Sequence, residues 1–305
     1  MAGHAADLHL HSTASDGDRT PAEVAGEAAA LGLRAFSLTD HDTIDGLAEA
    51  RQAADVAGIT FIPGVEVTMR FTLEYFTGSL HLLVYFTREM MEDRKFTGAL
   101  REAMSKGRGS HLVAARVERI NRVFGPGGET PVLSRPLREG EIHEYADNAT
   151  RRHFALALSQ RHGLSKDQVT RLIGNDSPAY VPSGADPCHI RPVIARWPVV
   201  ASLAHPAAGS FPGESHYREV LPPVITVQRL MPEFLDPEVL GIHALEVHYP
   251  GHTPDHERLL LDWADSLGLL VTGGSDAHDA TERPMGAAGM DDGELDALLS
   301  RLRQR

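Results

Sequence analysis

The stretch Asp7-Leu8-His9-Leu10-His11 decides how this chain is interpreted. In an extended strand, side chains two positions apart lie on the same face, so Asp7, His9 and His11 point in one direction. Two imidazoles beside a carboxylate suit Zn, Mn or Fe, and a strand holds such ligands more rigidly than a loop does. A half-buried strand whose polar face carries histidine is the alternative, so the spacing favours a metal site without establishing it.

Apolar runs that meet a histidine or an acid recur along the chain. They cover residues 37–42, 61–66, 80–85, 201–206, 244–248 and 269–278. A single histidine in such a place is more often a surface or satisfied core residue than a ligand. Their recurrence in a chain that alternates strand and helix predicts one site at the carboxyl-terminal mouth of an α/β barrel.

Composition narrows the kind of site and of partner. The 305 residues carry a formal net charge of −13 and one cysteine, Cys188, which excludes a disulfide framework and a thiolate-rich zinc site. The negative charge argues against duplex DNA, whereas a small phosphorylated substrate stays compatible because bound divalent ions reverse the local charge. No leader or membrane-spanning run is evident, so we expect a cytoplasmic protein without membrane contact.

Strand and helix alternate up to about residue 85. Thr20-Pro21-Ala22-Glu23 combines a capping hydroxyl, a first-turn proline and an acid at the third position, which predicts a helix that stops at Gly32. Strands are predicted over 35–38 and 60–67, with a helix over 44–56 between them. Such alternation is typical of parallel βα units.

The middle of the chain follows a different pattern. Apolar residues recur at helical spacing from 89 to 123, and further helices are predicted over 151–161 and 165–173, each followed by glycine. Structureless connections of this length are rare, so the pattern predicts a helical insertion. We expect residues 1–88 and 191–305 to form the barrel with the metal site, and residues 89–190 to form a helical subdomain that covers its mouth.

Taken in order, the motifs resemble those of the PHP (polymerase and histidinol phosphatase) metal-dependent phosphoesterases. They are Asp7-x-His9-x-His11, Ser15-Asp16-Gly17, Thr39-Asp40-His41-Asp42, Pro63-Gly64-Val65-Glu66, His81, Ala204-His205-Pro206 and Ser275-Asp276-Ala277-His278. Arg151-Arg152-His153-Phe154-Ala155 and Pro178-Ala179-Tyr180-Val181-Pro182 resemble the branch that removes the 3′-phosphate of nucleoside 3′,5′-bisphosphates and trims short RNA. The resemblance implies a distorted TIM-like (β/α)7 barrel with two or three divalent ions (Mn, Fe or Zn) at its mouth.

The resemblance also implies which residues hold the metals. The first metal would be held by His9, His11, Glu66 and Asp276. Glu66 would bridge to a second metal, completed by His81 and His205, and the third would be held by Asp16, His41 and His278. Outside these ligands, the residues that would orient the imidazoles are Asp7, Asp40 and Asp42.

Phosphate ester hydrolysis explains why so many ligands are needed. The ester repels a hydroxide nucleophile, and adjacent cations both lower the pKa of bound water and neutralise the phosphoryl oxygens. We therefore expect metal-bound hydroxide to attack the phosphate, with Glu66 and Asp276 as catalytic ligands. His252 is the candidate acid for the leaving alcohol, although a loop or helix-cap histidine is equally compatible with its position.

The expected substrate is a small nucleotide, with no obligate protein partner. Arg152 is expected to grip a second phosphate bidentately, with His153 as its partner and Tyr180 against the base or sugar. A solvated first-turn arginine and a packing tyrosine are the alternatives. At the level of the whole chain, two other interpretations stay open: a phosphatase for histidinol phosphate, and a catalytically silent PHP module that supports a partner protein.

Overall fold

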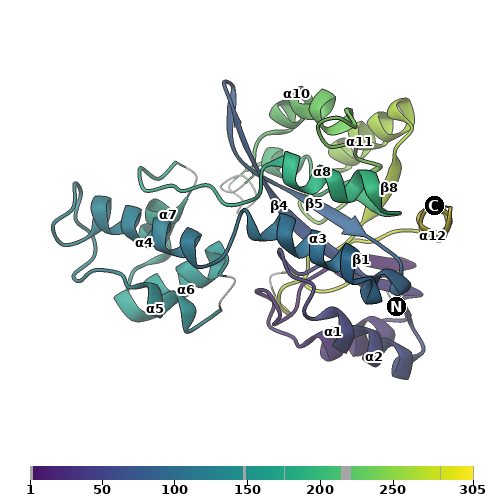
Figure 1. Ribbon diagram of the computed structural model, residues 1–305, viewed down its shortest axis with the longest axis horizontal. Coiled ribbons are helices and arrows are strands. Elements are labelled where there is room, and N and C mark those ends of the chain that lie inside the picture. The colour runs from purple at the N-terminus through teal and green to yellow at the C-terminus, as the bar shows by residue number, and fades with distance from the viewer. Residues whose placement is uncertain (1–2, 147–148, 175, 214–220, 282, 305) are drawn as a thin grey trace.

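The structure, a computed structural model, describes residues 3–146, 149–174, 176–213, 221–281 and 283–304 (Figure 1). The strands are β1 (Ala6–Leu10), β2 (Ala35–Leu38), β3 (Thr60–Phe61), β4 (Gly64–Leu73), β5 (Phe76–Tyr85), β6 (Val200–Leu203), β7 (Ala244–His248) and β8 (Leu270–Gly273). The α-helices are α1 (Pro21–Ala30), α2 (Leu47–Ala57), α3 (Arg94–Ser105), α4 (Ser110–Phe124), α5 (Glu139–His143), α6 (Arg151–His162), α7 (Lys166–Ile173), α8 (Pro187–Arg196), α10 (Val224–Leu235), α11 (Pro254–Leu267) and α12 (Asp292–Arg303). Two short 3-10 helices are η1 (Arg88–Glu92) and η2 (Ala208–Ser210).

Two sheets carry the main body of the molecule. One has the order β1-β2-β3 and is parallel, and the other has the order β4-β5-β6-β7-β8. Single bridges between Leu10 and Ala277 and between His41 and Glu66 join the two sheets. Because only such isolated bridges link them, the strands of the described residues form no closed barrel. The α/β class is as predicted, whereas the expected closed (β/α)7 barrel is not seen.

The hairpin of β4 and β5 departs from the predicted parallel alternation. The strand expected over 60–67 is split, because Pro63 has no N–H to donate to a ladder and separates β3 from β4. β4 then pairs antiparallel with β5, with Thr68 opposite His81 and Glu66 opposite Leu83. Glu66 and His81 are therefore diagonal neighbours on one face of the hairpin, which brings their side chains together.

Local capping signals fix several helices where the sequence predicts them. In α1 the Thr20 hydroxyl accepts from the Glu23 N–H, and the Glu23 carboxylate accepts from the Thr20 N–H at 2.7 Å. α6 stops before Gly163, and the Ser165 cap starts α7. The helical run predicted from 89 to 123 is instead broken into η1, α3 and α4, since Gly109 adopts a φ of 91° that ends helical geometry between α3 and α4.

The helices of the middle block form a lobe with its own core, seen on the left of Figure 1. Phe124 of α4, Phe154 and Leu158 of α6 and Leu172 of α7 are fully buried in this core. α3 belongs to the core of the main body, so the lobe proper begins later than the expected boundary at residue 89. Within the described ranges, no helix combines the length and apolar character that crossing a bilayer requires.

Candidate metal centre

Glu66 lies at the centre of a buried cluster of imidazoles. Its side chain is 1% exposed, and both carboxylate oxygens face ring nitrogens. Oε2 lies 3.3, 3.2 and 3.0 Å from nitrogens of His9, His11 and His41. Oε1 lies 2.8 and 3.2 Å from nitrogens of His81 and His205. One carboxylate of β4 therefore contacts five imidazoles that follow or belong to four other strands.

Two aspartates complete the cluster. Asp276 Oδ1 lies 3.1 Å from His11 Nε2, 3.5 Å from His9 Nε2 and 3.4 Å from His278 Nδ1. Asp16 Oδ1 lies 3.3 Å from His278 Nε2 and 3.8 Å from His11 Nδ1. The structure thus brings together all nine residues that the sequence analysis singled out as ligands.

Donor atoms of the cluster fall into three overlapping groups, in each of which they lie within 4.8 Å of one another. The groups are His9, His11, Glu66 and Asp276; His11, Asp16, His41 and His278; and His41, Glu66 and His81. The first group has the composition expected for the first metal. The second adds His11 to the set expected for the third metal. The last contains His41 where His205 was expected, although His205 Nε2 lies 3.3 Å from His81 Nδ1.

The donor set fits divalent metal ions. Among the described residues, none makes a hydrogen bond to His9 Nε2, to either ring nitrogen of His11 or to Glu66 Oε2, although all of these atoms are buried. Buried polar atoms are normally satisfied, and leaving them unsatisfied is costly. Burial alone would raise the pKa of Glu66, but the neighbouring imidazoles hold it well below its usual range. Converging nitrogen atoms and an ionised carboxylate are the ligands that Zn, Mn and Fe accept.

The backbone that carries the cluster is strained. Asp42, His205 and Asp276 have φ values of 49°, 35° and 52°, a region that residues other than glycine seldom adopt. Each such residue costs about 1–3 kcal/mol, and such residues concentrate at functional sites. At Gly274 a Cβ atom would come within 2.4 Å of the Cβ of His9, so only glycine lets the segment after β8 approach β1 so closely.

Glu246 of β7 is a site residue to which the sequence analysis gave no role. It is fully buried, and its Oε1 lies 2.8 Å from His9 Nδ1 while its Oε2 accepts from the His205 N–H at 2.7 Å. Since a carboxylate can only accept, His9 carries a proton on Nδ1, which leaves Nε2, the nitrogen that faces Glu66 and Asp276, as the atom that would bind a metal. The sequence feature that could have revealed Glu246 is an acidic residue in the middle of an otherwise apolar strand.

We expect Glu246→Gln to lower kcat/KM and metal affinity about 10–100-fold, the range typical of residues that orient a metal ligand. The glutamine oxygen can replace only one of the two contacts, because its NH₂ group then faces a donor. Metal content and phosphate release would be measured beside Glu238→Gln, a change at an exposed glutamate paired with Arg191. Equal behaviour of the two variants would contradict the orienting role of Glu246.

Asp7 and Asp40 bind loops rather than imidazoles, which corrects their expected role. The Ser275 hydroxyl donates to Asp7 at 2.6 Å, and the backbone N–H groups of Ser275 and Gly286 donate to it at 2.9 Å each. Burial raises the pKa of Asp7 to about 6. Asp40 accepts from the hydroxyls of Ser12 and Ser15 at 2.7 and 2.6 Å. Asp7 therefore fixes the segment that carries Asp276 and His278, and Asp40 fixes the segment that carries His11 and Asp16. In both cases serine hydroxyls, rather than imidazole rings, are the side-chain donors to the carboxylate.

Asp42 joins the main body to the lobe. It accepts from the N–H and the hydroxyl of Thr68 at 2.8 and 2.7 Å, and from the guanidinium of Arg108. Arg108 is buried in the break between α3 and α4 and also donates to the Thr68 hydroxyl at 2.9 Å. Sequence reasoning missed Arg108, since no local pattern ties it to Asp42. The pair connects the lobe with the segment that holds His41, in place of the expected carboxylate–imidazole contact.

The structure contradicts His252 as the acid for the leaving alcohol. Its Nε2 accepts from the Ala207 N–H at 3.2 Å, so the proton is on Nδ1, which donates to the Val247 carbonyl at 2.7 Å. Burial lowers the pKa of His252 to about 3. With both nitrogens bound to backbone and the ring neutral, His252 holds the turn that follows His205, as a structural histidine does.

The environment of His252 predicts how the free energy of unfolding depends on pH. Because the folded-state pKa lies below the usual 6.5, the contribution of His252 is fully present above pH 6.5 and is lost as pH falls toward about 3. In protein stripped of metal, we expect His252→Gln to unfold more easily at neutral pH and to lose less stability between these two pH values. Denaturant titrations at several pH values measure this slope. A slope unchanged from the parent protein would show that His252 is not held neutral.

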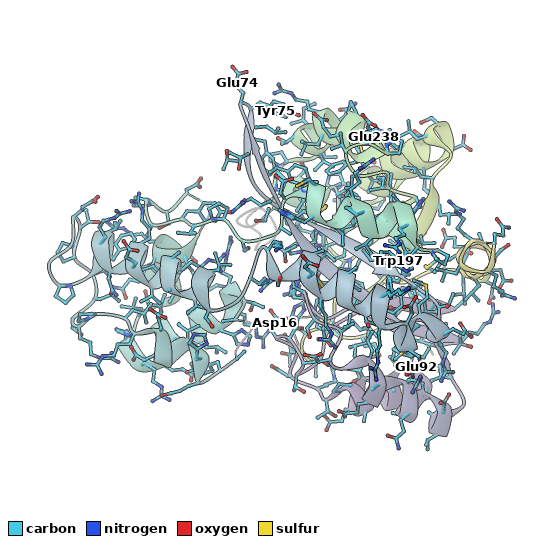
Figure 2. The ribbon with its side chains drawn as sticks, in the orientation of Figure 1. Asp16, Glu74, Tyr75, Glu92, Trp197 and Glu238 are labelled. Carbon is cyan, nitrogen blue, oxygen red and sulfur yellow. The ribbon has the colours of Figure 1, made fainter. Side chains whose placement is uncertain are left out.

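Of the expected substrate residues, Arg152 lies where the lobe meets the cluster. Arg152 of α6, 34% exposed, is 2.9 Å from Asp18 and 3.9 Å from Asp279, close to Asp16 and His278 in the chain. Figure 2 shows Asp16 on the side of the main body that faces the lobe. The Thr150 N–H donates to His153 Nδ1 at 2.9 Å, so His153 caps α6. Tyr180 is half-buried in the lobe, with the Arg151 guanidinium 5.9 Å from its ring centre.

A buried cluster of nitrogen and oxygen donors on an α/β body, beside a helical lobe, defines a metal-dependent hydrolase site. The chain matches the PHP domain over residues 7–175. It is 30% identical over 283 residues to a 5′-3′ exoribonuclease of Haemophilus influenzae, covering 89% of both proteins. It is 54% identical over 63 residues to a 3′,5′-nucleoside bisphosphate phosphatase of Chromobacterium violaceum, covering 21% of this chain and 22% of that protein. The chain belongs to the PHP domain family and is a metal-dependent phosphoesterase, as the motifs predicted.

Solved structures share this fold. A protein of Bifidobacterium adolescentis described as a metal-dependent phosphoesterase superposes with a TM-score of 0.73 at 23% identity, covering 98% of this chain and 96% of that protein. An amidohydrolase of Chromobacterium violaceum, solved with sulfate and no metal, superposes with a TM-score of 0.71 at 25% identity, covering 97% and 96%. The likeness extends over the lobe as well as the main body.

Proposed function

We propose that the chain hydrolyses phosphate esters of small nucleotides, removing the 3′-phosphate of nucleoside 3′,5′-bisphosphates and cleaving short oligoribonucleotides. The observation that carries this proposal is the donor cluster around Glu66, which faces a lobe whose Arg152 lies at its edge. The names of the relatives, a 5′-3′ exoribonuclease and a 3′,5′-nucleoside bisphosphate phosphatase, support the nucleotide class of substrate.

In this proposal three ions, Mn, Fe or Zn, occupy the cluster. The first is held by His9, His11, Glu66 and Asp276, the second by Glu66, His81 and His205, and the third by Asp16, His41 and His278. When bound, such cations supply Lewis acidity that lowers the pKa of water and offsets the negative charge of a phosphate. The chain itself keeps the donors in place: Glu246 fixes the tautomer of His9, and Asp7 and Asp40 hold the neighbouring loops.

Arg152 is the residue that we propose to bind a second phosphate. Its ion pairs with Asp18 and Asp279 hold the guanidinium fork at the edge of the cluster. A phosphate offers more charge than a carboxylate and matches the fork bidentately, so it can replace these partners. His153 is proposed to position Arg152, because its hydrogen bond with the Thr150 N–H fixes the start of α6 and with it the direction of Arg152.

A screen for released phosphate and, with RNA, for released mononucleotides tests the proposed function, because hydrolysis of an RNA phosphodiester gives a nucleotide and a shorter RNA rather than free phosphate. Protein supplied with Mn would be given adenosine 3′,5′-bisphosphate, a mononucleotide, a short 5′-phosphorylated RNA and histidinol phosphate. We expect turnover of the bisphosphate and the RNA. Turnover of histidinol phosphate alone would overturn the proposal in favour of an amino alcohol phosphatase.

Arg152→Ala tests the substrate class more closely. Charge-assisted hydrogen bonds contribute about 1.5–3 kcal/mol, so the KM for adenosine 3′,5′-bisphosphate is expected to rise about tenfold or more. The KM for an aryl phosphate, which has no second phosphate, is expected to stay within about twofold. Arg161→Ala is the matched control, because Arg161 is an exposed arginine at the other end of α6, paired with Glu144. Equal effects of Arg152→Ala on both substrates would remove its proposed role.

A further inference from the structure

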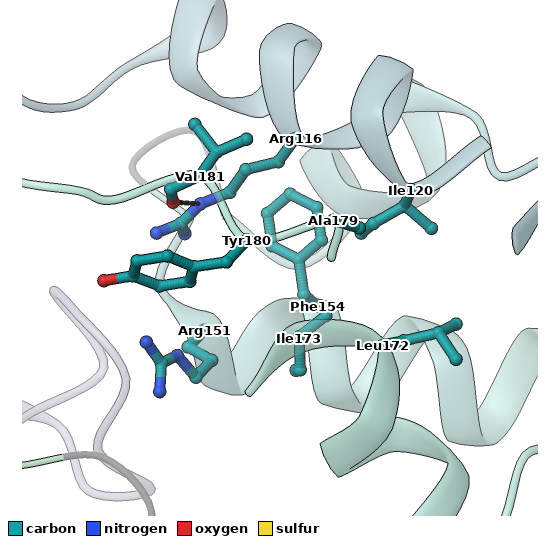
Figure 3. A pocket seen from close by; sticks show the side chains of 9 residues that line it. All are labelled: Arg116, Ile120, Arg151, Phe154, Leu172, Ile173, Ala179, Tyr180 and Val181. Atoms are coloured by element: carbon teal, nitrogen blue, oxygen red, sulfur yellow. Dashed lines mark hydrogen bonds between the residues drawn. The ribbon is translucent and has the colours of Figure 1, made fainter. Parts of the chain in front are cut away.

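A second group of cationic side chains lies in the lobe, apart from the metal centre. Arg116 of α4 and Arg151 of α6 line a pocket together with Tyr180 and the apolar side chains of Phe154 and Val181 (Figure 3). None of the residues of this pocket belongs to the cluster around Glu66, and the proposed function uses neither arginine.

Arg116 is a buried cation without a negative partner in the described part of the chain. It is 9% exposed, its Nε donates to the Val181 carbonyl at 3.2 Å, and its guanidinium lies 5.7 Å from the ring centre of Phe154. Burial, with the positive charges of Arg151 and Arg108, lowers the pKa of Arg116 to about 9. A buried charge is costly unless it is paired, so the pocket favours an anion.

The geometry suits an anion better than a stacked base. Figure 3 shows the ring of Tyr180 between the guanidinium groups of Arg116 and Arg151, and the phenol oxygen on the same side of the pocket as both groups. The guanidinium of Arg151 lies 5.9 Å from the centre of this ring, which leaves less room for a base to stack there. Together the side chains of Arg116, Arg151 and Tyr180 offer guanidinium N–H groups and a phenol hydroxyl, the donors that bind phosphate oxygens.

The pocket is connected to the metal centre through neighbouring residues. Arg151 and Arg152 are consecutive at the start of α6, so their side chains diverge by about 100°. Arg152 points to Asp18 of the main body, whereas Arg151 points into the lobe. Arg108, whose charge reaches Arg116, donates to Asp42 beside His41.

Charge is divided unevenly between the two parts of the chain. Residues 110–180, which form the lobe, contain 10 Lys and Arg against 8 Asp and Glu, a formal charge of +2, while the remaining residues carry −15. An anionic chain that leaves the metal centre is therefore favoured along the lobe rather than along the rest of the surface.

We propose that Arg116, Arg151 and Tyr180 form a subsite for a backbone phosphate of an oligoribonucleotide, beyond the phosphates held at the metal centre and by Arg152. This inference rests on the proposed function and narrows its substrate class. A mononucleoside bisphosphate has two phosphate groups and cannot fill all three places at once, whereas a 5′-phosphorylated RNA of three nucleotides has three. With this subsite, the protein binds short RNA chains more tightly than single nucleotides.

Kinetics on two substrates test the subsite. For a 5′-phosphorylated RNA trimer, Arg116→Ala is expected to raise KM about tenfold with kcat unchanged, and Tyr180→Phe a few-fold, while the KM for adenosine 3′,5′-bisphosphate stays the same in both. Arg122→Ala, at an exposed position of the same helix, is the matched control and is expected to change neither value. A KM for the trimer that is equal in Arg116→Ala and Arg122→Ala would overturn the subsite.

A binding measurement separates failure of the subsite from failure of the proposed function. Fluorescence anisotropy of a labelled trimer with metal-stripped protein needs no turnover, and Arg116→Ala is expected to weaken binding about tenfold relative to Arg122→Ala. If the parent protein releases neither phosphate from the bisphosphate nor mononucleotides from the trimer, the proposed function fails, and the anisotropy still decides the subsite. Should Arg116→Ala fail to fold by circular dichroism, Tyr180→Phe decides, because it removes only a hydroxyl. Unweakened binding by Tyr180→Phe would then overturn the proposal.

Discussion

Replacing Glu66 by glutamine is expected to abolish phosphoesterase activity, with a loss well beyond the roughly 100-fold that marks removal of an outer partner of a metal ligand. Both oxygens of Glu66 face imidazole nitrogens at 2.8–3.3 Å, so one carboxylate serves several donor groups at once. Glutamine has nearly the same shape but no charge, and its NH₂ group turns a donor toward the ring nitrogens. We expect the metal content to fall together with the activity.

Glu74→Gln is the matched control for this change. Glu74 lies in the turn of the same β4–β5 hairpin, exposed at the tip far from the cluster (Figure 2). Elemental analysis of both purified proteins gives metal per chain, and phosphate release gives the rate. Circular dichroism checks that Glu66→Gln keeps the fold. A Glu66→Gln protein with the parent's metal content and turnover would show that the cluster is not a metal centre.

Local chemistry explains why parts of the fold could be predicted. The Thr20 and Ser165 caps start helices by hydrogen bonds within four residues of sequence, so the pattern contains nearly all the information. The convergence of His9 and His11 with Glu66 could also be predicted, because ligands at or near strand ends of an α/β body meet at one edge.

The features of the fold that could not be predicted depend on pairing between segments that are distant in the sequence. The run 60–67 is mostly apolar and reads as one strand, and only the pairing of β4 with β5 shows that Pro63 divides it. Closure of a barrel likewise depends on whether the two sheets meet, and two bridges of the described residues do not close it. The direction of β5 is a property of its neighbours rather than of its own residues.

A local sequence pattern also cannot predict which group hydrogen-bonds to a given carboxylate. Asp7 stands two residues from His9 yet accepts from Ser275, which lies 268 positions away. Glu246 stands 237 positions from His9 and holds its ring. Spacing along a strand fixes the face on which a side chain lies, but the group that meets it there comes from another strand.

Removal of metal is the second change with a large expected effect. We expect chelation followed by dialysis to reduce phosphate release to background, and added Mn, Zn or Fe to restore it. Four buried atoms, His9 Nε2, both ring nitrogens of His11 and Glu66 Oε2, have no hydrogen-bond partner among the described residues, so the loss reflects the centre itself. Activity that survives exhaustive chelation, with metal absent by elemental analysis, would contradict the assignment of the cluster.

Rebinding of metal is expected to release protons. In the metal-free protein, burial acts to lower the pKa of His11, but the negative carboxylates of Asp276 and Glu66, 3.1 and 3.2 Å from its Nε2, outweigh it and raise the pKa to about 9. His11 is thus protonated at pH 7, and a metal must displace that proton to use the ring nitrogen. The apparent affinity for metal therefore increases as the pH is raised toward about 9, and it becomes weaker as the pH is lowered from that value. Calorimetric titrations in buffers of different ionisation enthalpy count the released protons, and a heat of binding independent of the buffer at pH 7 would show that His11 gives up no proton to the metal.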